Sequence, residues 1–137
     1  MAKVSNRVRA VWSVLITSLA APFFAGLAAV AIRLAGSAFG VALFAGGDVP
    51  AGDFAIAAFA WSAIPATITG LALIPYVLEA GTYSWLNAAI AGVVAFGASA
   101  LLVPVGAGPV MPFLAFLSGL IAIVMRLVLI RGGILKA

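Results

Sequence analysis

The chain has no cysteine, no histidine and few charged residues of either sign. Without cysteine it cannot form disulfides or thiolate zinc sites, and it has no thiol redox chemistry. Without histidine it lacks the commonest general base and the common haem ligand. Charged residues make up only 7% of its 137 residues, whereas soluble proteins carry about 25%. These absences exclude a water-soluble domain and most metal and redox functions.

Long uncharged stretches dominate what remains, and 66% of the residues are hydrophobic. The uncharged stretches cover residues 10–32, 54–78 and 80–125. A hydrocarbon core about 30 Å thick requires about 20 helical residues to cross. The third stretch is long enough for two crossings, and three prolines divide it: Pro104, Pro109 and Pro112.

The sequence therefore predicts an all-α membrane protein, a bundle of four transmembrane helices forming one domain over residues 1–137. The expected helices cover roughly residues 11–34, 54–78, 84–103 and 110–130. Pro22, Pro65 and Pro75 fall inside the first two and should bend them, because proline lacks a backbone donor.

The basic residues predict the orientation of the bundle. Four crossings place both termini on one side, with six basic residues there and only Arg33 on the other. Those six are Lys3, Arg7, Arg9, Arg126, Arg131 and Lys136. Cytoplasmic loops are enriched in lysine and arginine, so we expect both termini in the cytoplasm, in a bacterial inner (plasma) membrane. Aromatic residues expected near the same boundary are Trp12, Tyr76, Tyr83 and Trp85.

The one longer connection is predicted between the first two helices, on the outer side. Its apolar residues 37–45 are too few to span a bilayer. They form either a short interfacial helix or an extension of the first helix. A cluster of glycine, aspartate and proline follows, and Asp53 is well placed as the N-cap of the second helix.

Two ion pairs are candidates at the ends of the bundle. Arg126 and Glu79 are expected at similar depth on the cytoplasmic side, where a pair would join the fourth helix to the hairpin of the second and third. The alternative is that Arg126 extends toward the headgroups. On the outer side, Arg33 could pair with Asp48 or Asp53; the alternative is that all three remain solvated.

The second helix carries the clearest pattern for packing. Ala58, Ser62, Ala66 and Gly70 recur every four residues, and such small residues let helices approach closely in lipid. A second interpretation is that Ser62, Thr67 and Thr69 of this helix, with Glu79 just after it, line a transport path, as broken helices do in carriers. Against this, helical threonines commonly bond to their own backbone.

No catalytic, metal or cofactor site is predicted, because no nucleophile has a base beside it. Nor does any pattern indicate nucleic-acid binding. The expected partners are the lipid bilayer and either a membrane-protein partner or further copies of the chain. We expect an accessory or structural subunit of a larger membrane assembly. The alternative is a homo-oligomeric transporter or channel for a small solute or ion.

Overall fold

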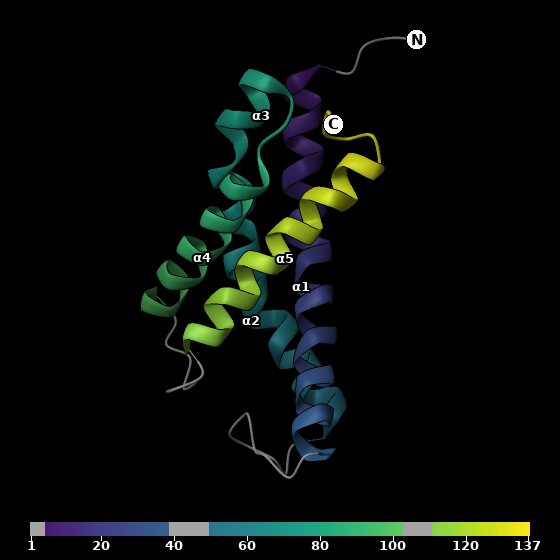
Figure 1. Ribbon diagram of the computed structural model, residues 1–137, viewed down its shortest axis with the longest axis vertical. Helices are drawn as coiled ribbons and strands as arrows, with labels where there is room; N and C mark the ends of the chain where they lie inside the picture. The colour runs from purple at the N-terminus through teal and green to yellow at the C-terminus, as the bar shows by residue number, and fades with distance from the viewer. Residues whose placement is uncertain (1–4, 39–49, 103–110) are drawn as a thin grey trace.

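The computed structural model describes residues 5–38, 50–102 and 111–137, and within these ranges the chain is helical with no strand. Its helices, in the order in which Figure 1 colours them, are α1 (Asn6–Ala38), α2 (Ala51–Ala72), α3 (Ile74–Ala80), α4 (Trp85–Leu102) and α5 (Met111–Arg131).

Four helical segments of the described chain are long and apolar enough to cross a membrane: Asn6–Gly36, Ala55–Ala80, Trp85–Leu102 and Pro112–Arg131. The second of these segments contains most of α2 and all of α3. The prediction of an all-α chain with four such segments is therefore confirmed.

Helix α1 is longer than predicted, with 33 residues and a length of about 50 Å. It starts at Asn6, before the apolar stretch begins. Its first turns carry Arg7 and Arg9, since a helix can continue through polar residues. Pro22 is buried within it and leaves the Ser18 carbonyl without its helical donor. The Ser18 hydroxyl donates to the Val14 carbonyl at 2.7 Å, in the turn just before.

The predicted second helix is in fact two helices, which is a correction to the sequence interpretation. The break lies at Leu73, and Pro75 occupies the first turn of α3, where a missing backbone donor is tolerated. Helix α3 then ends at Gly81, whose φ of 74° is left-handed. Glycine adopts this conformation without the strain that a side chain would add.

The start of α2 corrects a second expectation. Its N-cap is Pro50, without a side-chain cap bond, and Asp53 instead lies in the first turn. An acidic residue there still interacts favourably with the positive end of the helix dipole. Of the apolar segment 37–45, residues 37 and 38 end α1, and the remainder lies outside the described residues, as does Asp48.

The two hairpins pack through small residues. In the α4–α5 contact, a Cβ atom at Gly92 would lie 2.8 Å from the Ser118 carbonyl oxygen. The Ser118 hydroxyl donates to the Gly92 carbonyl at 2.9 Å. In the α1–α2 contact, a Cβ atom at Gly70 would lie 3.4 Å from the Val14 Cα. Such close approach suits helices that associate by packing.

The hydrophobic core lies toward the end of the molecule that holds α3. One cluster there consists of Ala10, Leu73, Val77, Tyr83, Ala88, Ala122, Leu129 and Leu135. A second, smaller cluster joins Ala21, Ala66 and Met125 from three helices.

The start of α1 and the C-terminal residues lie at this same end (Figure 1). Toward the other end the α4–α5 hairpin separates from α1 (Figure 1), and Leu101 and Leu102 are 87% and 73% exposed.

Candidate functional site

A tight turn ends α5, and the residues after it fold back onto the bundle. Gly133 has a φ of 75°, its N–H donates to the Ile130 carbonyl at 3.0 Å, and the Ile134 N–H donates to the Leu129 carbonyl at 2.9 Å. These two bonds define a Schellman motif. Leu135 follows and is 2% exposed, within the larger core cluster. We call residues 132–136 the C-terminal turn.

Two other elements hold the C-terminal turn in place. The Lys136 N–H donates to the Gly81 carbonyl at 3.0 Å, which joins the turn to the end of α3. From α1, Arg9 Nη1 donates to the Ile134 carbonyl at 2.7 Å and to the Gly133 carbonyl at 3.3 Å. Sequence reasoning predicted the fourth helix to end near residue 130 and assigned no structure to the residues after it. The signal it missed is Gly132-Gly133 followed by two apolar residues, the pattern of a Schellman turn.

Asn6 adds a further link at the same end. Its side-chain amide donates to the Leu78 carbonyl at 3.1 Å, which connects the first turn of α1 to α3. This carbonyl lies in the last turn of α3, where helical carbonyls have no partner within the helix. The start of α1 is thus joined to the end of α3 and to the C-terminal turn by side chains that bond to backbone carbonyls.

Tyr83 lies in the connection between α3 and α4 and is 3% exposed. It belongs to the aromatic residues expected near one boundary, and unlike Tyr76 and Trp85 it is buried. Burial raises the pKa of the Tyr83 hydroxyl to about 12, while a hydrogen bond with Ser13 and the charge of Arg126 act in the opposite direction. The carbonyl of the same residue accepts a bond from Arg126 Nε at 2.5 Å.

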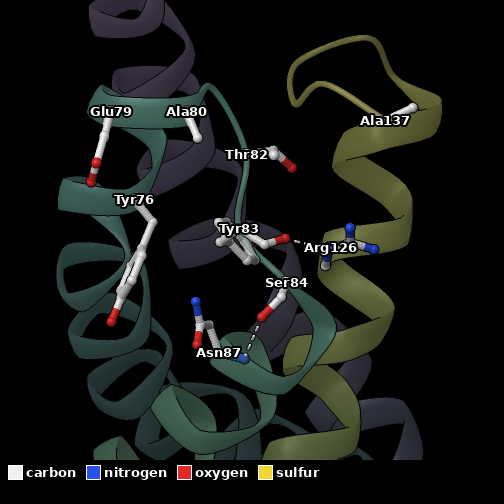
Figure 2. Close-up of a pocket in the computed structure, with 9 residues that line it drawn as sticks. All are labelled: Tyr76, Glu79, Ala80, Thr82, Tyr83, Ser84, Asn87, Arg126 and Ala137. Carbon is white, nitrogen blue, oxygen red and sulfur yellow. Dashed lines mark hydrogen bonds between the residues drawn. The ribbon is translucent and has the colours of Figure 1, made fainter.

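Beside Tyr83 lies an open pocket of about 330 Å³ (Figure 2). It is formed by α3, the α3–α4 connection, the first turn of α4, and α5. Its lining residues are Tyr76, Glu79, Ala80, Thr82, Tyr83, Ser84, Asn87, Arg126 and Ala137. We call it the end pocket. Ser84 caps α4 at its edge by accepting a bond from the Asn87 N–H at 3.1 Å.

The structure brings Arg126 and Glu79 to the same pocket, but on opposite sides of it (Figure 2). The contact that positions Arg126 is its bond to the Tyr83 carbonyl. Glu79, in the last turns of α3, is exposed. Both residues line the pocket, but no ion pair between these two described side chains is present.

The outer candidates lie at the other end of the helices. Arg33 is half-buried near the end of α1, and Asp53 is exposed in the first turn of α2. Asp48 lies outside the described residues. A contact between Arg33 and either aspartate stays a prediction.

The small-residue row of α2 is partly inside the bundle. Ala66 and Gly70 are buried, and Ala58 and Ser62 are half-buried. Ala66 packs with Ala21 of α1 and Met125 of α5 in the smaller core cluster.

Of the residues of the suggested transport path, Glu79 lines the end pocket, whereas Ser62, Thr67 and Thr69 are not among its lining residues. Thr67 is exposed and Thr69 is buried, so they lie on different faces of α2. Each hydroxyl donates to the carbonyl four residues earlier, at 2.7 Å. The Ser62 hydroxyl donates to the Phe59 carbonyl at 3.0 Å. Backbone bonding by these hydroxyls, the alternative interpretation, is confirmed.

Among the described residues no three histidine, cysteine or acidic side chains gather where a metal could bind. The end pocket can offer one cation, one carboxylate, an amide and hydroxyls, which suits binding of a polar group. The chain matches no family model, no curated protein and no solved structure.

Proposed function

We propose that the chain is an integral protein of a bacterial inner membrane, with both termini in the cytoplasm. Support comes from the four apolar segments and from the basic residues near one end of the bundle. Of the described basic residues, those close to this end are Arg7, Arg9, Arg126, Arg131 and Lys136. An excess of arginine and lysine is typical of the cytoplasmic side.

Thiol labelling tests this orientation without background, because the chain has no cysteine of its own. Ser5→Cys places a thiol before α1, and Asp53→Cys places one at the start of α2. A membrane-impermeant maleimide should label Asp53→Cys in spheroplasts and Ser5→Cys only after the membrane is permeabilised. The reverse pattern would contradict the orientation, and labelling of both in intact spheroplasts would contradict the four crossings.

Within that membrane, we infer that the chain serves as an accessory or structural subunit of a larger assembly. The observation that carries this proposal is that four hydroxyl side chains in the described helices bond to the backbone of the bundle. Thr67, Thr69 and Ser99 donate to carbonyls of their own helices, and Ser118 donates across to α4. These hydroxyl groups are therefore not free to bind a substrate between the helices.

The outward face of α4 offers a surface for a partner helix. Gly97 is exposed with no atom within 4 Å of a Cβ built on it. Large apolar neighbours surround it: Val93 and Val94, with exposed fractions of 41% and 63%, and Leu101. An exposed glycine between large side chains leaves a depression into which another transmembrane helix can pack.

The assembly is tested by extracting the tagged protein from membranes in polymer-bounded nanodiscs and measuring its native mass. We expect a mass that includes other membrane proteins, and Gly97→Leu should reduce that association. Ala57→Leu, at an exposed small residue of α2, is the matched control and should not. A monomer in the native membrane would contradict the subunit proposal, and a closed ring of identical chains would favour the transport alternative.

The transport alternative has less support. It requires a continuous polar path, and the hydroxyls of α2 point to different faces of that helix and bond to it. Even as an oligomer, the chain would have to build its path from Thr67 without Thr69, because only Thr67 is exposed.

A further inference from the structure

We propose that the end pocket binds the headgroup of an aminophospholipid of the ethanolamine class. The phosphate would lie toward Arg126 and the primary ammonium toward Glu79. The inference rests on the bilayer location proposed above, but not on a partner assembly. It assigns a ligand to a pocket that the subunit role leaves unused.

The anion side of the pocket is provided by Arg126. Its Nε donates a hydrogen bond to the Tyr83 carbonyl, and this bond fixes the guanidinium at the wall of the pocket. The described residues provide no hydrogen-bond partner for its two terminal nitrogens. Arginine presents several donors in one plane, a geometry that matches the oxygens of a phosphate.

Neutral polar groups also line the pocket. The Thr82 hydroxyl oxygen is buried without a hydrogen-bond partner, and Thr82 lines the pocket. A threonine hydroxyl can both donate and accept, so it remains able to bond to a phosphate oxygen. The half-buried Asn87 lines the same pocket, and Figure 2 shows its side-chain amide beside Ser84.

Glu79 makes the pocket suitable for a zwitterion. It lies across the pocket from Arg126 (Figure 2), so the pocket presents a cation and a carboxylate on opposite sides. A purely anionic headgroup would meet repulsion from the carboxylate. A headgroup that joins a phosphate to an ammonium would satisfy both, and a primary ammonium can donate to the carboxylate.

The position of the pocket favours a lipid over a soluble phosphoamine. It opens at the end of the apolar segments, next to Tyr76 and Trp85, which are 46% and 60% exposed. Exposed aromatic residues of this kind mark the headgroup depth of a bilayer. Below the pocket, Leu86 and Ile90 are exposed along α4, where acyl chains can pack.

Native mass spectrometry of the purified protein, titrated with single lipids in detergent, tests the proposal. Phosphatidylethanolamine should bind at one site more tightly than phosphatidylglycerol. Glu79→Gln should weaken phosphatidylethanolamine about tenfold without weakening phosphatidylglycerol, and Arg126→Gln should weaken both about tenfold. The control Arg131→Gln, an exposed residue outside the pocket, should change neither.

Asn87→Ala provides a second variant if Arg126→Gln does not fold, because Asn87 also lines the pocket. It should weaken phosphatidylethanolamine severalfold. Unchanged affinity in both Glu79→Gln and Asn87→Ala would overturn the proposal. Glycerophosphoethanolamine, the headgroup without acyl chains, should not displace the lipid at equal concentration; if it does, the ligand is a soluble phosphoamine. Loss of the partner assembly would leave these titrations unchanged, so the two proposals fail separately.

Discussion

Arg9 and Ile134 are separated by 125 positions, and Arg9 Nη1 donates to the Ile134 carbonyl oxygen at 2.7 Å. This bond joins the start of α1 to the turn that ends α5. These carbonyls lie beyond the end of α5, and a guanidinium is a strong, charged donor for such backbone acceptors. The bond therefore connects the first helix of the described bundle to the end of the last one.

We expect Arg9→Met to detach the C-terminal turn, because methionine keeps most of the apolar part of the arginine side chain but lacks the guanidinium. Loss of a hydrogen bond to a charged group should cost about 1.5–3 kcal/mol of unfolding free energy. The backbone amides of Ile134 and Leu135 should exchange hydrogen faster. Both quantities can be measured in detergent, by denaturant titration and by hydrogen-exchange mass spectrometry. Arg7→Met is the matched control, because Arg7 is exposed on the same helix; an equal effect of both variants would contradict the role of Arg9.

Gly92→Ala should destabilise the bundle, although alanine is a better helix former than glycine. The new methyl group would lie 2.8 Å from the Ser118 carbonyl oxygen and 3.0 Å from the Ala122 Cβ, so α4 and α5 must move apart. Overpacking of this kind costs about 1–3 kcal/mol. Thermal unfolding in detergent should show a lower midpoint.

Gly97→Ala on the same helix is the control, since no atom lies within 4 Å of its added methyl group. We expect that variant to be as stable as the wild type or more stable by up to about 1 kcal/mol. If both substitutions lower the midpoint equally, the close contact at Gly92 does not limit the packing of α4 and α5.

The four apolar segments could be predicted from the sequence because crossing a membrane requires a long uncharged stretch, which composition alone reveals. The break at Leu73 was harder to place. Pro75 indicated a disturbance, but either a bend or a new helix was compatible with it. Asp53 matched the N-cap pattern, yet the helix starts three residues earlier, after Pro50.

The end pocket was only half predictable. Counting residues along each helix gives the depth of a side chain, and it placed Arg126 and Glu79 at one level. It does not give the rotation of one helix against another, which decides whether two side chains meet. The bond from Arg9 to the C-terminal turn likewise depends on how distant helices pack, so no local pattern could reveal it.

Leu129→Ala should cost about 2–5 kcal/mol of unfolding free energy, because Leu129 is fully buried in the larger core cluster. Its loss leaves a cavity between helices that lipid cannot fill. Leu127→Ala is the control, with Leu127 being 51% exposed on the same helix. Denaturant unfolding in one detergent should separate the two variants by more than about 1 kcal/mol, and similar values would contradict the placement of the core.

Because Tyr83 is buried, we expect the folded protein to lose stability at high pH. Burial raises its pKa from 10.0 to about 12 in the folded protein. The unfolded chain therefore releases this proton at lower pH than the folded protein does. The contribution to stability is complete below pH 10.0 and is lost as the pH rises to about 12. We expect the unfolding free energy to fall by about 2–3 kcal/mol across this interval.

Two phenylalanine variants isolate this effect, because the chain has only two tyrosines. In Tyr76→Phe, the ultraviolet absorbance of tyrosinate should rise with a midpoint near pH 12 in the folded protein, since only Tyr83 remains. In Tyr83→Phe, that transition should be absent, and stability should depend less on pH above 10.0. A tyrosinate transition near pH 10.0 in folded Tyr76→Phe would mean that Tyr83 is accessible to water. The packing of the α3–α4 connection against Ser13 would then be wrong.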